Sequence, residues 1–167
     1  MNHSARQTNA TILNALPKEN LIFLPMTAAD IEPVWSIEKL AYPFPWTKNN
    51  FEDVLKCNYI ANCVYLNQQL VGYFIAMSVI DEWHLLNLCV TPAFQQRGLG
   101  KKILAKAHDY GRLKHASIAI LEVRKSNLSA QKLYFRFGYE LIGCRANYYQ
   151  ANNGKREDAL VMTCQLL

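Results

Sequence analysis

Hydrophobic positions along the chain change their spacing several times, and each change predicts an element of structure. Residues 21–26 (LIFLPM) are continuously apolar and predict a strand. Apolar residues then recur at helical spacing between Thr27, a capping residue type, and Ile37. The segment 42–46 (YPFPW) ends that helix, because prolines and the residues before them disfavour the α conformation. Thr47 predicts the start of a second, short helix.

Three β-rich apolar runs follow, at residues 59–66, 70–80 and 83–90. Only the short polar turns NQQ and DE separate them, so they predict an antiparallel meander.

The second half of the chain alternates between helical and strand patterns. It predicts a helix over 99–114, a buried strand over 117–123, and a helix that Ser126 or Asn127 opens and Gly138 ends. The sequence ANNG, flanked by two apolar runs, predicts a C-terminal hairpin. The resulting order, β-αα-βββ-α-β-α-ββ, indicates an α/β fold with a single mixed, mostly antiparallel, twisted sheet flanked by helices.

The length of 167 residues fits one domain, expected over residues 20–167 after a polar N-terminal extension at 1–19. The N-terminus lacks the basic start and apolar block of a signal peptide. No apolar run reaches the ~18 residues of a membrane span. We therefore expect a cytoplasmic protein with no membrane partner.

The five cysteines are odd in number, scattered and without a C-x-x-C pair. This pattern argues against a disulfide framework and a zinc site, and no other metal-binding constellation is visible. Buried thiols in a reducing compartment are the expectation.

Charge divides the chain unevenly. Residues 1–91 hold five Lys/Arg and eight Asp/Glu, a net charge of −3, whereas residues 92–167 hold thirteen and five, a net charge of +8. The basic half predicts an anionic partner, either nucleic acid or a phosphorylated small molecule.

The hexad QQRGLG, residues 95–100, lies between a predicted strand and a predicted helix. It fails the P-loop pattern at two positions and the G-x-G-x-x-G dinucleotide pattern at Ile103. It fits a third pattern, [QR]-x-x-G-x-[GA]. Glycines let the backbone approach a ligand closely, and a helix N-terminus leaves unpaired N–H groups. With Arg97, Lys101 and Lys102 beside it, the hexad predicts a pyrophosphate site rather than a plain glycine turn.

The blocks LLNLCVTPAFQQRGLGKKIL and LEVRKSNLSAQKLYFRFGY resemble the GCN5-related N-acetyltransferases (GNAT). FPW, LEVRKSN, NYY and REDALVM are similar to the RimI-type ribosomal-protein-alanine branch of that family, and the resemblance runs from about Leu21 to Leu167. It implies the GNAT fold and acetyl-CoA as the acetyl donor.

The resemblance also implies which residues hold acetyl-CoA. The backbone of Leu88, Cys89 and Val90 would pair with the pantetheine arm, and Asn127 matches a family asparagine that contacts the cofactor. The residues implied for the pyrophosphate are Gln96, Arg97, Gly98, Leu99, Gly100 and Lys101. A backbone N–H of the 88–90 strand, at a bulge, is a candidate to stabilise the oxyanion.

Acyl transfer to an amine requires a base for the amine proton and an acid for the thiolate. Glu122 is the candidate base, since a carboxylate in the apolar run SIAILEV needs a partner or a wet cleft. The alternative is a structural ion pair with Arg124 or Lys125. His84 is the rival base. The resemblance favours Glu122 and implies that Tyr134 is the acid, whereas a core aromatic is the alternative for Tyr134.

The resemblance implies that the acceptor is the N-terminal alanine amine of a small-subunit ribosomal protein. It places Phe44, Trp46, Tyr148 and Tyr149 along the acceptor groove, where ordinary packing is their alternative role. A lysine or small-molecule amine is the second enzymatic hypothesis. A nucleic-acid-binding module is the third, but the basic residues do not interleave with aromatics, which argues against direct nucleic-acid binding.

Overall fold

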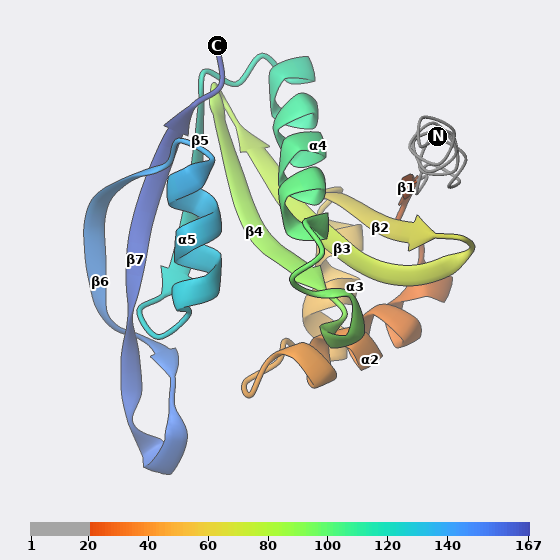
Figure 1. The fold of residues 1–167 in the computed structure, drawn as a ribbon, viewed down its shortest axis with the longest axis horizontal. Coiled ribbons are helices and arrows are strands. Elements are labelled where there is room, and N and C mark those ends of the chain that lie inside the picture. The colour runs from red at the N-terminus through yellow and green to blue at the C-terminus, as the bar shows by residue number, and fades with distance from the viewer. Residues whose placement is uncertain (1–20) are drawn as a thin grey trace, which may run out of the picture.

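Seven strands form one sheet in the order β1-β2-β3-β4-β5-β7-β6 in the computed structural model, which describes residues 21–167 (Figure 1). The strands are β1 (Leu21–Pro25), β2 (Ile60–Leu66), β3 (Gln69–Val79), β4 (Glu82–Val90), β5 (Ile118–Arg124), β6 (Glu140–Gln150) and β7 (Arg156–Gln165). Within this sheet β4 and β5 pair in parallel, and the other neighbours are antiparallel. The predicted α/β class with a mixed, mostly antiparallel sheet is confirmed. The predicted extension at 1–19 lies outside the described residues.

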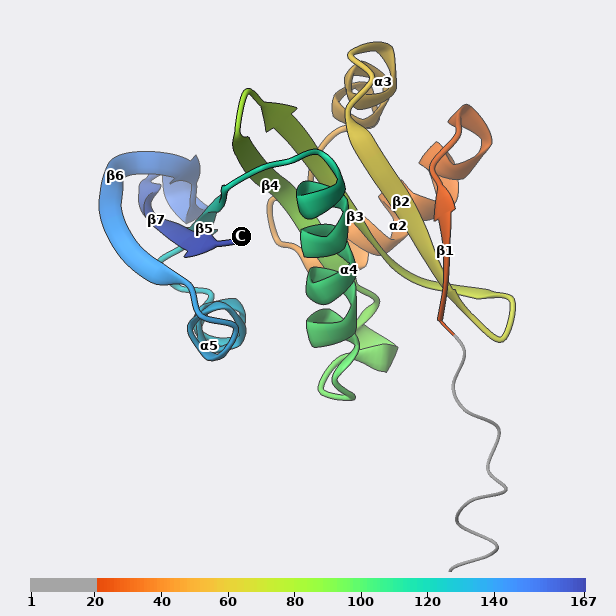
Figure 2. The ribbon, with the colours of Figure 1, turned by 90° about the horizontal axis from the view of Figure 1, so that it is seen from above.

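Helices cover both faces of the sheet (Figure 2). They are α2 (Ile31–Ala41), α3 (Lys48–Lys56), α4 (Leu99–Leu113) and α5 (Leu128–Arg136), with 3-10 turns η1 (Ala28–Asp30), η2 (Pro92–Phe94) and η3 (Asn152–Gly154). The core on one face is shared with α4 and α5, and the core on the other with α2 and α3. Within residues 21–167, no helix has the length and hydropathy needed to span a membrane.

The unbroken apolar runs of the central strands follow from this two-sided burial. In β3, Phe74 packs in the core beneath α4, whereas Tyr73 and Ile75 pack in the core beneath α2 and α3. Successive side chains of a strand point to opposite faces, so a strand buried on both sides is apolar at every position.

The predicted cap at Thr27 is confirmed, with Asp30 in the first turn, and that turn is the 3-10 turn η1, which leads into α2. One prediction needs correction. The expectation of buried thiols is confirmed for Cys63 and Cys89. Cys164 is only half-buried, and the expectation is wrong for Cys57 and Cys144, which are exposed. These two lie at a helix end and on the edge strand β6, where no second layer covers them.

The feature that creates the site is the separation of β4 from β5. The two strands pair only between residues 82–85 and 118–121 and then diverge (Figure 1). A bulge lies at the divergence, since Ile75 pairs with Asn87 and Ala76 with Leu85, which leaves Leu86 without a partner in β3. A bulge bends its strand and increases the local twist. Beyond it, the outer edge of β4 lacks a neighbouring strand.

Candidate active site

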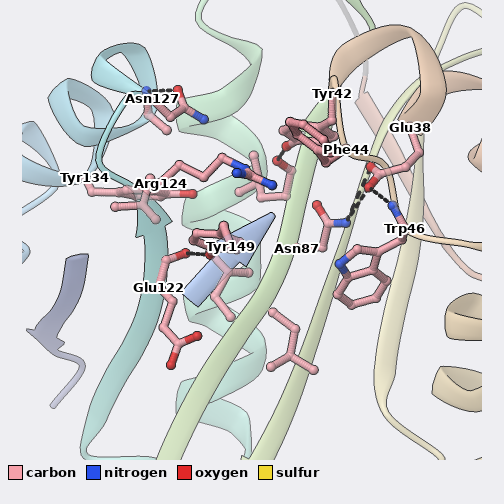
Figure 3. A pocket seen from close by; sticks show the side chains of 15 residues that line it. Glu38, Tyr42, Phe44, Trp46, Asn87, Glu122, Arg124, Asn127, Tyr134 and Tyr149 are labelled. Atoms are coloured by element: carbon pink, nitrogen blue, oxygen red, sulfur yellow. Dashed lines mark hydrogen bonds between the residues drawn. The ribbon is translucent and has the colours of Figure 1, made fainter. Parts of the chain in front are cut away.

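A pocket lies between the diverging strands, and its cavity volume is about 120 Å³ (Figure 3). It is lined from α2 and its following loop, from β4 and β5, from α5 and its N-cap residue, and from the end of β6. The lining residues are Glu38, Tyr42, Phe44, Trp46, Leu85, Leu86, Asn87, Leu88, Glu122, Val123, Arg124, Asn127, Ala130, Tyr134 and Tyr149. The structure thus brings Leu88, Glu122, Asn127 and Tyr134, four of the predicted site residues, into one cavity.

The backbone of β4 presents alternate residues to the open edge. The Cys89 carbonyl points toward β3. Its oxygen is so close to Gly72 of β3 that a Cβ at that glycine would lie 2.4 Å from it. The peptide groups of Leu88 and Val90 therefore face away from β3. Their carbonyl oxygens already accept hydrogen bonds, from the Tyr42 hydroxyl at 2.8 Å and from Gln95 Nε2 at 3.0 Å respectively. The Cys89 side chain is buried in the core beneath α2 and α3.

The bulge lies at Leu86, two residues before the predicted 88–90 segment. Leu86 lines the pocket, so the irregular backbone expected there exists at the edge of the cavity.

Residues 95–98 of the hexad form an exposed turn between η2 and α4, separate from the pocket lining, whereas Leu99 is buried and begins α4 together with Gly100. Gly98 is the N-cap of α4 with φ of 79°, a conformation that favours glycine, and Gln96 also has a positive φ, 60°. The first i→i−4 bond of the helix runs from the Lys102 N–H to the Gly98 carbonyl at 3.3 Å. The N–H groups of the preceding residues of the first turn therefore have no helical acceptor.

Basic side chains stand around this turn. The Arg97 guanidinium stacks over the Phe94 ring with its carbon 5.1 Å from the ring centroid. Lys101 is exposed at the first turn of α4. Unpaired N–H groups with nearby cations suit a phosphate group.

Glu122 enters the pocket from the end of β5, directly after the last residue that pairs with β4. Its carboxylate Oε1 lies 2.9 Å from Arg145 Nε on β6. A hydrogen bond to the same carboxylate is the main reason that the pKa of Tyr148 is raised.

The structural partners expected for Glu122 are wrong. Arg124 pairs instead with Glu157 at 3.2 Å, and Lys125 with Asp158 at 3.7 Å. Glu122 and Arg124 lie on the same face of β5, but the Arg124 guanidinium is bound by the Gln150 carbonyl and by Glu157, so the partner of Glu122 comes from β6 instead.

His84, the rival base, lies where β4 and β5 are still paired, outside the region in which they diverge. Its Nε2 is 2.6 Å from Glu82 Oε2, and its register partner in β5 is Ile120, where the two strands are still paired. It does not line the pocket.

Tyr134 lies in the wall of the pocket on α5 and is 8% exposed. Its ring packs against Tyr139 with a centroid distance of 5.6 Å. Burial raises the pKa of the Tyr134 hydroxyl, with a further contribution from Tyr149, so the phenol stays protonated at neutral pH. Asn127 opens α5, and its Oδ1 accepts a hydrogen bond from the Ala130 N–H at 3.1 Å.

Three of the four predicted groove aromatics line the cavity. Phe44, Trp46 and Tyr149 do so, whereas Tyr148 lies outside the lining with its ring at right angles to that of Tyr149. The Tyr149 hydroxyl donates to the backbone carbonyl of Glu122 at 3.2 Å.

Glu38 is a site residue that the sequence analysis missed. It is 2% exposed, yet it lines the pocket opposite Glu122 (Figure 3). Its carboxylate accepts hydrogen bonds from the Trp46 N–H at 2.9 Å and from the Tyr73 hydroxyl. Desolvation raises the pKa of Glu38 despite these bonds. The available signal was its position four residues after Val34, on the buried stripe of α2.

Other missed lining residues are Tyr42, Asn87 and Arg124. In the described part of the chain, no group of three or more His, Cys, Asp or Glu side chains could hold a metal ion.

Two carboxylates on opposite walls, a protonated phenol, an open strand edge and a turn of unpaired N–H groups describe a site for proton transfer beside a phosphorylated ligand. The family model of the acetyltransferase (GNAT) family matches residues 31–139.

Similar proteins agree in fold and sequence. A ribosomal protein bS18-alanine N-acetyltransferase of Haemophilus influenzae is 35% identical over 139 residues, covering 83% of this chain and 94% of that protein. The Haemophilus ducreyi enzyme of the same name is 36% identical over 138 residues, covering 82% and 94%. The crystal structure of the ribosomal-protein-S18-alanine N-acetyltransferase from Escherichia coli has a TM-score of 0.81 at 30% identity, covering 88% of this chain and 94% of that one. The chain therefore belongs to the acetyltransferase (GNAT) family.

Proposed function

We propose that this protein transfers the acetyl group of acetyl-CoA to the N-terminal alanine amine of ribosomal protein bS18, in the cytoplasm. The observation that carries the proposal is the pocket at the β4–β5 divergence, which holds Glu122 and Tyr134 on one cavity wall. Relatives at 35% and 36% identity are named for this reaction.

The residues present fit acetyl-CoA, which supplies an activated thioester. Gln96, Arg97, Gly98, Leu99, Gly100 and Lys101 would hold the pyrophosphate, since the first turn of α4 offers N–H groups without helical acceptors. The open edge of β4 would bind the pantetheine arm. Because the carbonyls of Leu88 and Val90 already accept side-chain bonds, the N–H groups of these two residues would donate to that arm. Asn127, at the mouth of α5, completes the cofactor contacts.

Glu122 would act as the general base. An α-amine has a pKa of about 8, so a large share is already neutral near neutral pH, and a carboxylate acting through a water molecule suffices. Arg145 and Tyr148 hold the carboxylate in place and so fix its direction.

Tyr134 would act as the general acid toward the departing thiolate. Its raised pKa keeps the proton on the phenol until the thiolate forms. Direct attack by the amine requires no nucleophilic side chain.

Glu38 would organise the acceptor wall. By binding the Trp46 N–H, Glu38 fixes the loop that carries Phe44 and Trp46, which is the wall expected to contact the substrate amine. Its carboxylate also adds a second group, besides Glu122, that can accept a hydrogen bond from that amine. A cavity of about 120 Å³ suits a small first side chain such as alanine.

The decisive experiment incubates the protein with acetyl-CoA and bS18 beginning with alanine, and locates the added acetyl group by intact-mass and fragment mass spectrometry. The matched control is the same substrate with its N-terminus blocked. Acetylation of the N-terminal amine is expected. Modification of lysines in the blocked control at an equal rate would support the alternative, an acetyltransferase for lysine or small amines, which the named relatives do not favour.

A further inference from the structure

Arg124 crosses the pocket from the end of β5, and none of the roles assigned above uses it. Its side chain is 17% exposed. The guanidinium carbon lies 4.4 Å from the ring centroid of Tyr149 and 5.3 Å from that of Phe44 (Figure 3). The guanidinium thus lies between two aromatic rings, Phe44 on the β4 side of the pocket and Tyr149 on the β5 side.

One edge of this guanidinium is anchored. Nη1 donates to the Gln150 carbonyl at 2.8 Å and to Glu157 Oε2 at 3.2 Å. Glu157 is itself held by the Ser126 N–H at 2.6 Å. Although burial acts to raise the pKa of Glu157, the bonds from Ser126 and Arg124 lower it overall. The Glu157 carboxylate that binds Arg124 is therefore ionised and held in place.

The other edge is open. A guanidinium has five N–H donors, and the two bonds above both come from Nη1. Within residues 21–167, Nε and Nη2 have no hydrogen-bond acceptor, and Arg124 lines the cavity. These donors remain accessible, so a ligand oxygen that enters the cavity can accept a charge-assisted hydrogen bond from them.

The charges around Arg124 indicate whether the ligand oxygen that it binds is anionic or neutral. Two acidic side chains, Glu38 and Glu122, line the same cavity and disfavour an anionic ligand group there. A neutral carbonyl oxygen has no such penalty. In a peptide N-terminus, the carbonyl carbon of the first residue is two bonds from the reacting amine.

We propose that the open edge of Arg124 binds the carbonyl oxygen of the first residue of the acceptor, and that this contact selects α-amines over lysine side chains and polyamines. The inference rests on the proposed function. A lysine ε-amine or a polyamine brings methylene groups to this position and leaves the donors unpaired, and sites that hydrogen-bond a substrate group reject analogues that lack it. Arg124 is thereby a specificity-determining residue.

The test uses three peptides that begin with alanine. The first has a normal amide, the second has a trans-alkene in place of the first amide and so lacks the carbonyl oxygen, and the third is N-methylated at the first amide and keeps that oxygen. The expected kcat/KM of the full-length wild type for the alkene peptide is about 10- to 100-fold lower, the range for a hydrogen bond to a charged group. The N-methyl peptide stays close to the normal one. Equal use of the alkene peptide overturns the inference.

A substitution gives the second arm. In Arg124→Gln the difference between the normal and alkene peptides should largely disappear, and the preference for the α-amine over the lysine of an N-terminally blocked peptide should narrow. Arg124→Lys, which keeps one cationic donor, should retain part of the difference. Lys114→Gln, an exposed change of the same charge at the far end of α4, should retain all of it. A fall by one common factor for all three peptides in Arg124→Gln would show a structural role and overturn the inference.

Two failures remain distinguishable. If the wild type acetylates no N-terminal peptide, the proposed function fails and this inference falls with it. If it acetylates the normal and alkene peptides equally, only the role of Arg124 fails. Thermal melting and CoA binding verify that the variants are folded, and the wild-type comparison decides the matter even if Arg124→Gln is unstable.

Discussion

The Glu38 carboxylate lies 2.9 Å from the backbone nitrogen of Trp46 and joins the middle of α2 to the loop that forms one wall of the pocket. This is a buried carboxylate whose main partners are neutral donors: a backbone N–H and the Tyr73 hydroxyl. Fold stability and the shape of the acceptor wall therefore depend on the same side chain.

Glu38→Ala should destabilise the protein by about 1–3 kcal/mol for each buried donor left unpaired. Glu38→Gln should cost less, since an amide oxygen still accepts from the Trp46 N–H. Urea denaturation measures both. Wild-type stability in the alanine variant would contradict the structural role.

Burial of the Glu38 carboxyl group also predicts that the stability of the protein depends on pH. Desolvation raises the pKa of Glu38 above 4.5, so the folded state holds this proton more tightly than the unfolded chain does. The stabilisation is complete below the unfolded pKa and is lost as pH rises through the raised folded pKa. The wild type should therefore lose stability relative to Glu38→Gln as pH rises through this range. Urea denaturation of both proteins at several pH values measures the difference in their free energies of unfolding.

Glu122→Gln should lower kcat by about 100-fold or more, because a general base contributes on the order of 10²–10⁴ in rate. CoA binding, measured by calorimetry, should persist. Glu140→Gln, an exposed neutralisation at the start of β6, is the matched control and should keep its activity. Full activity of the Glu122 variant from about pH 6 to 9 would remove it from the base role.

Tyr134→Phe should lower kcat on the order of 10²-fold with little change in CoA affinity, since only the proton donor is lost. Because the pKa of Tyr134 is raised, the wild type should show no decline in kcat from loss of this proton up to about pH 10. Tyr59→Phe removes a hydroxyl away from the pocket and should change neither value. An alkaline decline absent from the phenylalanine variant would contradict the raised pKa.

Gly98→Ala should weaken CoA binding about tenfold, which corresponds to 1.4 kcal/mol. The cause is the backbone, since a Cβ at Gly98 meets nothing within 4 Å but its φ of +79° disfavours any other residue. Gly154→Ala has the same open space and a φ of +68°, but lies in the β6–β7 turn. Equal loss of CoA affinity in both variants would show that backbone strain acts through general stability rather than at the turn.

The order of strands and helices along the chain and the hexad turn could be predicted from the sequence because each depends on a local pattern. The 3.6 and 2.0 periods, the Thr47 cap and the glycine turn act within a few residues. The expected cap at Asn127 is likewise present, with its Oδ1 on the Ala130 N–H.

The partners of the charged site residues could not be predicted in this way. Glu122 pairs with Arg145, 23 positions along the chain, and Glu38 with Tyr73, 35 positions along. Strand register and sheet order decide these contacts, and neither leaves a local signal. The position of Glu38 on the buried stripe of α2 indicates burial, but its partners Tyr73 and the Trp46 N–H cannot be read from that stripe.

The divergence of β4 from β5 leaves the sheet with an unfilled position in its interior. The two halves of the sheet are joined there by four residue pairs, Glu82–Leu85 with Ile118–Leu121. A ligand that fills the position completes the sheet and binds only the native chain, so it raises the free energy of unfolding as its concentration exceeds its Kd. The resistance of this protein to proteolysis should therefore rise with the concentration of a ligand that binds between these strands.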